Sequence, residues 1–177
     1  MEDHIRAILE EIDPHSDQMD KTPGRVSAFC KDFFSGYGTD PNHIAGAFYD
    51  SEMNDLIILK DIAFESVCEH HLAPIIGTAS VGYVPNGKII IGASKLARIV
   101  DCFAHRLQLQ ERMTIGIGRA VDSILQAKGV GVYVEAEHFC ISNRGVKKRG
   151  ARFVTRYFSG VLQGSLRQEF LATVLSR

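Results

Sequence analysis

The stretch LIILKDIAFESVCEHHLAPIIGTASVGYV, residues 56–84, decides the fold. Its two ends, LIILKDIAFES and IIGTASVGYV, are rich in aliphatic and β-branched residues, and the polar letters CEHH lie between them. This pattern predicts two long strands. The turn Pro85-Asn86-Gly87 then leads into KIIIG, residues 88–92, which predicts a third, shorter strand. We therefore expect a β-sheet in the middle of the chain.

Helical patterns and further strands follow this segment. Ser94 can cap a first helix, and a second helix is expected from about Gln108 to Gln126. The segments GVGVYVEAEHFCIS, residues 129–142, and ARFVTRYFSGVL, residues 151–162, have strand composition. The mixture predicts one α+β domain.

The N-terminal residues 1–50 predict a helical arm. Apolar residues recur at helical spacing from Ile5 to Ile12. A second helix is expected to start at Thr22, as its N-cap, and to end near Gly36.

Residues 51–177 are expected to form the rest of a single domain, because no repeat, low-complexity tract or linker interrupts them. Ser165 and Gln168 predict a capping box for a last helix. A sheet of this kind has open edges, which proteins usually cover or pair, so assembly with copies of the same chain is expected.

The composition is that of an ordinary globular protein: 177 residues, 45% hydrophobic, 23% charged, with a net charge of -1. This charge balance gives no overall positive potential that would attract nucleic acid. Basic residues do gather in segment 144–156, where they form either a solvated edge or an anion site. No apolar run reaches the roughly 18 residues of a membrane span. The N-terminus MEDHIRAILEEID is acidic where a signal peptide is basic. We expect a cytoplasmic protein that binds neither nucleic acid nor membrane.

The densest chemical feature is Cys68-Glu69-His70-His71. One helical turn at this point would project Cys68 and His71 from the same side, where both could bind one metal ion. In a reducing cytoplasm the four cysteines of the chain are expected to be buried thiols or metal ligands, not disulfides. This C-x-x-H half-site needs a partner from elsewhere in the sequence.

The partner is His138-Phe139-Cys140, at the end of a predicted strand whose period of two places His138 and Cys140 on one face. Cys68, His71 and Cys140 form a three-ligand set that suits Zn2+ and leaves a fourth position for water, whose pKa zinc lowers to about 7. His70 and His138 would then be free for proton transfer. The alternative is a closed structural site in which one of these histidines is a fourth ligand and the other is a core residue.

Two further clusters suit parts of a nucleotide. Gly92 leads into a helix start with Ser94, Lys95 and Arg98, where free backbone N–H groups and positive charge suit a phosphate. The carboxylate of Glu111 can accept two hydrogen bonds from the edge of a guanine ring. Taken alone, the Ser94 cluster is equally compatible with an ordinary capped helix. Glu111 is equally compatible with a Glu of the kind that is common in first helical turns.

Taken together, the chain resembles GTP cyclohydrolase I over about residues 22–170. The motifs are TPGRV (22–26), DIAFESVCEHHLAP (61–74), GYVPNGKIIIGASKLARIVDCFAHRLQLQERMT (82–114), EAEHFCISNRGV (135–146) and RQEFL (167–171). The resemblance implies the tunnelling fold: an antiparallel four-stranded sheet with two helices packed on one face, here with the N-terminal arm at 1–50 and the catalytic domain at 51–177.

The resemblance also implies a reaction. Zinc held by Cys68, His71 and Cys140 would activate a water that attacks C8 of GTP, with His70 and His138 handling protons and Ser94 assisting the later rearrangement. Ring opening, release of formate and an Amadori-type rearrangement would give 7,8-dihydroneopterin triphosphate. This hydrolase reaction is the first step of pterin and tetrahydrofolate biosynthesis, within one-carbon metabolism.

Substrate contacts and assembly follow from the same resemblance. Glu111 and Gln110 would hold the guanine ring. The residues implied around the triphosphate are Ser94, Lys95, Arg98, Arg144 and Arg25. The family forms a toroidal homodecamer, a dimer of pentamers, in which two chains share each active site.

Three segments depart from the pattern of the family. IDPHSDQMDK stands where a GEDP-REGL-like stretch is usual, Ala28 stands where a lysine is common, and ARFVTRYFSG replaces a run of small hydroxylated residues. Two alternatives stay open, and these changes favour only the second. One is a related tunnelling-fold enzyme, similar to pyruvoyltetrahydropterin synthase or a nitrile reductase. The other is a metal-binding or regulatory paralogue without turnover.

Overall fold

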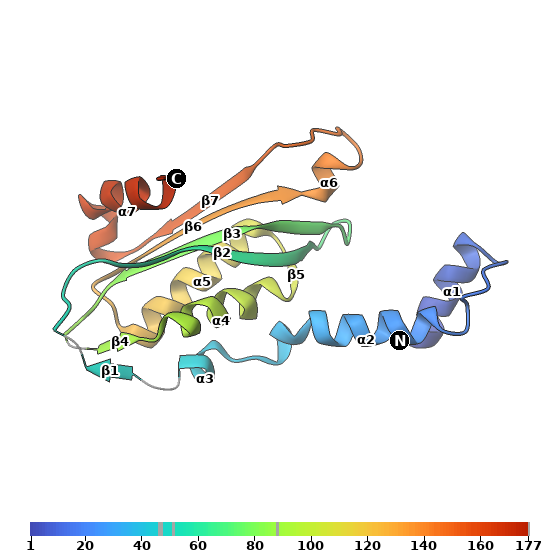
Figure 1. Cartoon of the computed structure of the whole chain (residues 1–177), viewed down its shortest axis with the longest axis horizontal. Coiled ribbons are helices and arrows are strands. Elements are labelled where there is room, and N and C mark those ends of the chain that lie inside the picture. The colour runs from blue at the N-terminus through green and yellow to red at the C-terminus, as the bar shows by residue number, and fades with distance from the viewer. Residues whose placement is uncertain (46–47, 51, 88, 177) are drawn as a thin grey trace. The chain divides into compact units, whose positions relative to one another are not determined.

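The computed structural model describes residues 1–45, 48–50, 52–87 and 89–176 (Figure 1). The chain divides into two compact units, Met1–Ser35 and Gly36–Arg177. In the first unit, α1 (Glu2–Ile12) packs against α2 (Thr22–Phe33). Both predicted helices are confirmed, but Lys21 and not Thr22 is the N-cap of α2. The proposed domain boundary at 50/51 stays a prediction.

The second unit is built on a five-stranded sheet with the order β5-β2-β3-β6-β7. β2, β3, β6 and β7 are antiparallel neighbours, which confirms the four-stranded sheet of the tunnelling fold, and the two-residue β5 adds a parallel strand at the end of β2. The bounds are β2 (Ile57–Cys68), β3 (Pro74–Val84), β5 (Leu107–Gln108), β6 (Gly129–His138) and β7 (Phe153–Phe158).

A second, two-stranded sheet pairs β1 (Phe48–Asp50) with β4 (Ile89–Ile91). β4 confirms the predicted short strand, although Lys88, which the sequence places in it, lies outside the described residues. Nothing in the sequence pattern predicted β1. The remaining short elements of this part of the chain are η1 (Ser35–Gly38) and α3 (Pro41–Ala45).

Two long helices, α4 (Ala93–Ala104) and α5 (Gln110–Leu125), cover one face of the five-stranded sheet, as predicted (Figure 1). The apolar stripe of β6 shows why. Val130, Val132 and Val134 alternate along the strand, are fully buried, and join the core that both helices complete. Burial of this alternating face is the main force that holds the layers together.

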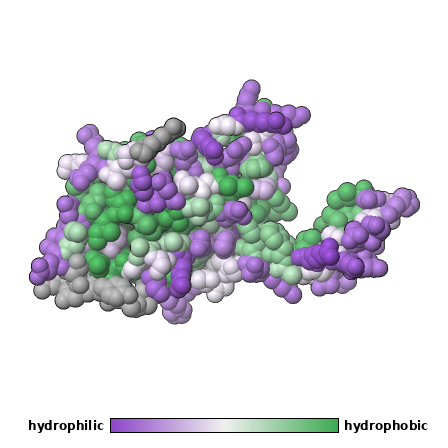
Figure 2. Space-filling model, viewed as in Figure 1, coloured by the Kyte–Doolittle hydropathy of each residue, from purple (hydrophilic) through white to green (hydrophobic). Residues whose placement is uncertain are grey.

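The opposite face of the sheet is partly covered by η2 (Gly160–Gln163) and α7 (Leu166–Leu175). Phe170 and Leu162 are fully buried in a second apolar cluster with Val84 and Val174. The predicted capping box is wrong, because the side chain of Ser165 makes no capping hydrogen bond. In the view of Figure 2, apolar side chains gather over the region of α4 and α5, where Ile115 is among the exposed apolar residues.

The contact between α5 and β7 is unusually close. A Cβ atom added to Gly118 would lie 2.1 Å from Cδ1 of the Tyr157 ring. Carbon atoms in contact are normally separated by about 3.5–4.0 Å, so only glycine fits here without a shift. This contact packs the middle of α5 against β7, and functional residues described next lie at the start of the same helix.

Candidate functional site

The turn after β2 brings Cys68 and His71 together. The N–H groups of His71 and Leu72 both donate to the carbonyl of Cys68, at 3.4 and 2.9 Å. This single helical turn, which the C-x-x-H spacing predicted, leaves Cys68 Sγ 4.0 Å from His71 Nδ1. Leu72 closes the turn with a positive φ of 52°.

Cys140 approaches from the neighbouring part of the sheet. β6 ends at His138, which is paired with Ile75 of β3, and the chain then enters the short helix α6 (Phe139–Ser142). The expected alternation of His138 and Cys140 along one strand is therefore wrong. Both residues nevertheless face the same site, because the chain bends into α6 directly after the strand.

The three potential ligands fit a zinc-sized cation. The ligand atoms of Cys68, His71 and Cys140 all lie within 4.8 Å of one another. Tetrahedral zinc with a Zn–S bond of about 2.3 Å and a Zn–N bond of about 2.05 Å needs S···S and S···N separations of roughly 3.8 and 3.6 Å. Small side-chain rotations would shorten the separations between the ligand atoms, now up to 4.8 Å, to these values. No fourth His, Cys, Asp or Glu of the described residues joins the group.

A pocket of about 190 Å³ opens next to these ligands. This is below the roughly 300–1,000 Å³ of typical ligand pockets, so one chain encloses only part of a nucleotide-sized ligand. His70 and His138 and the proposed guanine-binding pair, Gln110 and Glu111, are in its wall. The lining residues are Cys68, His70, Gln108, Leu109, Gln110, Glu111, His138, Cys140, Ile141 and Phe153.

Electrostatics distinguish the groups in this pocket. Burial lowers the pKa of His138, and the nearby Glu111 carboxylate opposes this shift. Burial, followed by the adjacent Cys68, raises the pKa of the Cys140 thiol, while Arg144 has a small opposing effect. The adjacent Cys68 thus disfavours ionisation of the Cys140 thiol, and a bound cation would offset this effect.

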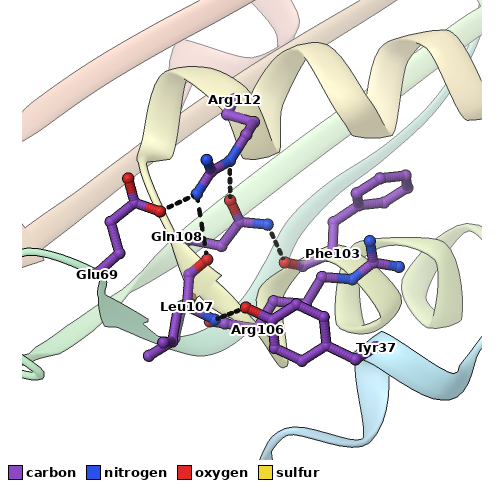
Figure 3. Close-up of polar contacts among 8 residues, drawn as sticks. Tyr37, Glu69, Phe103, Arg106, Leu107, Gln108 and Arg112 are labelled. Atoms are coloured by element: carbon purple, nitrogen blue, oxygen red, sulfur yellow. Dashed lines mark hydrogen bonds and ion pairs between the residues drawn. The ribbon is translucent and has the colours of Figure 1, made fainter.

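A polar network that the sequence did not reveal ties this turn to the start of α5 (Figure 3). The guanidinium of Arg112 donates to the carboxylate of Glu69 and to the side-chain oxygen of Gln108. Gln108 in turn donates to the carbonyl of Phe103 at 2.6 Å. The network therefore holds Glu69, between the potential ligand Cys68 and His70, against the helix that carries Glu111.

The same junction is braced on its other side. The hydroxyl of Tyr37 accepts a hydrogen bond from the backbone N–H of Leu107 at 3.1 Å, and Arg106 stacks over the rings of Phe103 and Tyr37 (Figure 3).

Because Leu107 and Gln108 form β5, the predicted start of the second helix at Gln108 is wrong, and α5 begins at Gln110.

The proposed phosphate contacts are not part of this pocket. Ser94 and Lys95 are in the first turn of α4, whose N-cap is Gly92, so the predicted capping role of Ser94 is wrong. The 12 residues of α4 span about 18 Å, and its far end leads into β5 beside Cys68. Ser94 and Arg98 are exposed. The cluster therefore lies at the end of α4 away from the thiols.

The remaining two proposed phosphate contacts are exposed. Arg144 follows α6, near Cys140, and Arg25 is on α2 in the first unit.

Comparison with known proteins decides the family. A sequence profile described as GTP cyclohydrolase I matches residues 1–175. The chain belongs to the GTP cyclohydrolase I family. Among similar curated proteins, all named GTP cyclohydrolase 1, that of Bacillus cytotoxicus is 42% identical and covers 100% of this chain and 96% of its own.

Two further relatives named GTP cyclohydrolase 1 agree. The protein of Streptococcus mutans is 40% identical over 98% of this chain and 93% of its own. That of Brucella anthropi is 41% identical over 93% of this chain and 78% of its own. Family membership confirms the resemblance and the fold, and it decides against a pyruvoyltetrahydropterin synthase-like or nitrile reductase-like enzyme. None of the described helices is both long and apolar enough to span a bilayer.

Proposed function

We propose that this member of the GTP cyclohydrolase I family hydrolyses the imidazole ring of GTP, releases C8 as formate and rearranges the remainder to 7,8-dihydroneopterin triphosphate, the first step of pterin and tetrahydrofolate biosynthesis. The observation that carries the proposal is the convergence of a potential metal site with His70, His138 and Glu111 at one pocket. Each of these groups has a separate part in the reaction.

Cys68, His71 and Cys140 would hold Zn2+. Two thiolates and an imidazole favour zinc over harder cations, and three protein ligands leave a position open for water. When bound, the metal supplies Lewis-acid activation of the water that attacks C8. His71 is exposed and Cys68 is buried, so the ligand set lies between the core and the open side of the pocket.

The guanine ring would be held by the first turn of α5. Glu111 is exposed at the pocket, and its carboxylate can accept from N1–H and the exocyclic amino group of guanine. Gln110, its neighbour, stays a prediction as a direct guanine contact, because its side chain has other partners in the structure, described below. Binding through Glu111 would orient C8 toward the metal ligands.

His70 and His138 would move protons. Both line the pocket next to the proposed metal ligands, beside the position that C8 would occupy. Burial lowers the pKa of His138, which favours the neutral form that can accept a proton. His70 is exposed at the open side of the pocket, where it suits exchange with solvent.

Assembly would complete the site. The pocket is small, and Ser94, Lys95 and Arg98 lie at the other end of α4. The outer edge of β7 pairs with no strand of the described residues and offers free backbone groups to a second copy. We therefore propose a homodecamer, built as a dimer of pentamers, in which the phosphate-binding cluster of one chain faces the pocket of another, with Arg144 and Arg25 as further phosphate contacts.

The free cysteines support a cytoplasmic location. Cys30, Cys68, Cys102 and Cys140 form no disulfide in the structure, and thiol ligands stay reduced in the cytoplasm.

The test is incubation of zinc-loaded protein with GTP, with formate and the pterin absorbance and fluorescence followed in the same samples. Formate together with a pterin chromophore supports the whole reaction. Formate alone would mean that ring opening occurs without the rearrangement. Neither product, with zinc retained, would contradict the proposal and favour a paralogue without turnover.

A further inference from the structure

Gln110 occupies an unusual position for a residue beside a substrate pocket. Only 1% of its surface is exposed, although it is the first residue of α5 and its neighbour Glu111 is exposed. Its side-chain oxygen contacts Nε2 of His138 at 2.7 Å. Its side-chain nitrogen lies within hydrogen-bond distance of three oxygens: Val134 O at 3.2 Å, Phe153 O at 3.0 Å and Thr155 Oγ1 at 3.0 Å.

Two of these three oxygens fix which way the amide of Gln110 points. The carbonyls of Val134 and Phe153 can only accept hydrogen bonds, so the group that faces them must be the amide NH2. A flipped amide would bring its oxygen against both carbonyl oxygens in a buried site, where unpaired acceptors are costly. The oxygen of the amide must therefore face His138.

The hydroxyl groups nearby agree with this orientation. Thr114 donates its single hydroxyl proton to the backbone carbonyl of Gln110 at 2.8 Å. The 2.7 Å contact between the hydroxyls of Thr114 and Thr155 then requires Thr155 to be the donor. The oxygen of Thr155 is consequently left to accept from Gln110, whose two amide hydrogens are shared among three acceptors: this hydroxyl and the carbonyls of Val134 and Phe153.

We propose that Gln110 is a positioning residue that holds the proton of His138 on Nε2. An oxygen that can only accept requires N–H on the atom facing it, so a neutral His138 carries its lone pair on Nδ1. Since Nε2 is engaged with the buried amide, Nδ1 is the ring nitrogen available to a group in the pocket. The inference rests on the proposed function for its consequence: Nδ1 of His138 is the ring nitrogen left to contact the substrate.

The ring of His138 is also held in orientation by packing. Phe153, whose carbonyl accepts from Gln110, has its own ring 5.2 Å from the imidazole in an edge-to-face arrangement. β7 therefore contributes to this site in two ways: its backbone and Thr155 orient the amide, and the Phe153 side chain supports the imidazole. The bulky segment 151–159 thus takes part in the wall of the pocket.

The direct test is neutron diffraction from deuterium-exchanged crystals of the zinc-loaded protein. We expect deuterium on Nε2 of His138, and a bare Nε2 would overturn the inference. The measurement does not depend on turnover. A protein that releases formate but has a bare Nε2 contradicts only this inference, whereas deuterium on Nε2 without any formate contradicts only the proposed function.

A kinetic test separates positioning from substrate binding. In zinc-loaded Gln110→Leu, we expect kcat to fall about 10- to 100-fold, the range found when a group that orients a functional histidine is removed, with the KM for GTP within about threefold. A raised KM with unchanged kcat would assign Gln110 to guanine binding, and two unchanged constants would give it no role; either result overturns the inference. Gln168→Leu, the same change at an exposed site on α7, is the matched control. If Gln110→Leu does not fold, the neutron measurement on the unaltered protein still decides.

Discussion

Replacement of Gly118 by alanine probes the contact that aligns α5 with β7. The new Cβ would lie 2.1 Å from Cδ1 and 2.5 Å from Cε1 of Tyr157. Relief needs a movement of more than about 1 Å, by the ring or by the helix. Because β7 also carries Phe153 and Thr155, which orient Gln110, a shift of the helix would disturb the pocket as well.

The magnitude follows from two opposing effects. Forcing a methyl group into a well-packed core costs about 1–3 kcal/mol, and an alanine in place of glycine inside a helix gains up to about 1 kcal/mol. We expect Gly118→Ala to lower the free energy of unfolding by about 1 kcal/mol in the unaltered background. In a Tyr157→Ala background the clash is absent, so the same change should raise that free energy.

Urea denaturation of the four proteins of this double-mutant cycle measures the difference. Gly24→Ala in α2 is the matched control, because a Cβ at this position meets only Glu2 Oε2, at 4.0 Å, and we expect no destabilisation there. An equal effect of Gly118→Ala in both Tyr157 backgrounds would refute the packing argument.

Four further predictions test the site and its surroundings. Cys140→Ser should abolish zinc retention, measured by elemental analysis, together with turnover, because it removes one of the two thiolates. Glu111→Ala should keep zinc and raise the KM for GTP at least about tenfold, the equivalent of one lost hydrogen bond to a charged group. Lys95→Ala combined with Arg98→Ala should reduce the preference for GTP over guanosine, compared by kcat/KM. Asp101→Asn should raise the urea midpoint at neutral pH, because burial raises the pKa of this carboxyl above its ordinary value of 3.8 despite the opposing effect of His105. Because the pKa of Asp101 is higher in the folded protein, its ionisation destabilises the fold at neutral pH. Below about pH 3.8 the carboxyl is protonated in both the folded and the unfolded protein, so the advantage of the variant should disappear there.

Matched substitutions keep the first three of these results specific. Cys30→Ser, Glu65→Ala and Lys128→Ala change residues outside the pocket and the phosphate cluster, and each should leave zinc content and kinetics unchanged. Zinc retained by Cys140→Ser, a normal KM in Glu111→Ala, or an undiminished preference for GTP in the Lys95 and Arg98 variant would contradict the assigned roles. A gain for Asp101→Asn that persists at acidic pH would contradict a charge-based cause.

The sequence predicted the group that could hold a metal because a C-x-x-H turn is a local feature. The four residues from Cys68 to His71 determine their own geometry, and the structure has that turn. Cys140 was placed correctly for the wrong reason. A continued strand was expected, but the chain leaves the strand at His138 and enters α6.

Long-range contacts were beyond the sequence pattern. Gln110 and Glu111 are adjacent residues for which the sequence predicts the same role. At the start of α5, however, Gln110 is buried against β7 and Glu111 is exposed. Thr155, which completes the hydrogen-bond network, was predicted only as a strand residue. The two residues of β5 are too few for any periodicity, so the expected helix start at Gln108 was two residues early.

The most direct test of the proposed activity is carbon NMR of zinc-loaded protein mixed with GTP that carries carbon-13 at C8. The account predicts that the C8 signal of GTP decays into a single signal of labelled formate, and that Cys140→Ser, assayed in parallel, produces none. A pterin or other product that keeps the label, or a C8 signal that stays unchanged while zinc remains bound, would contradict it.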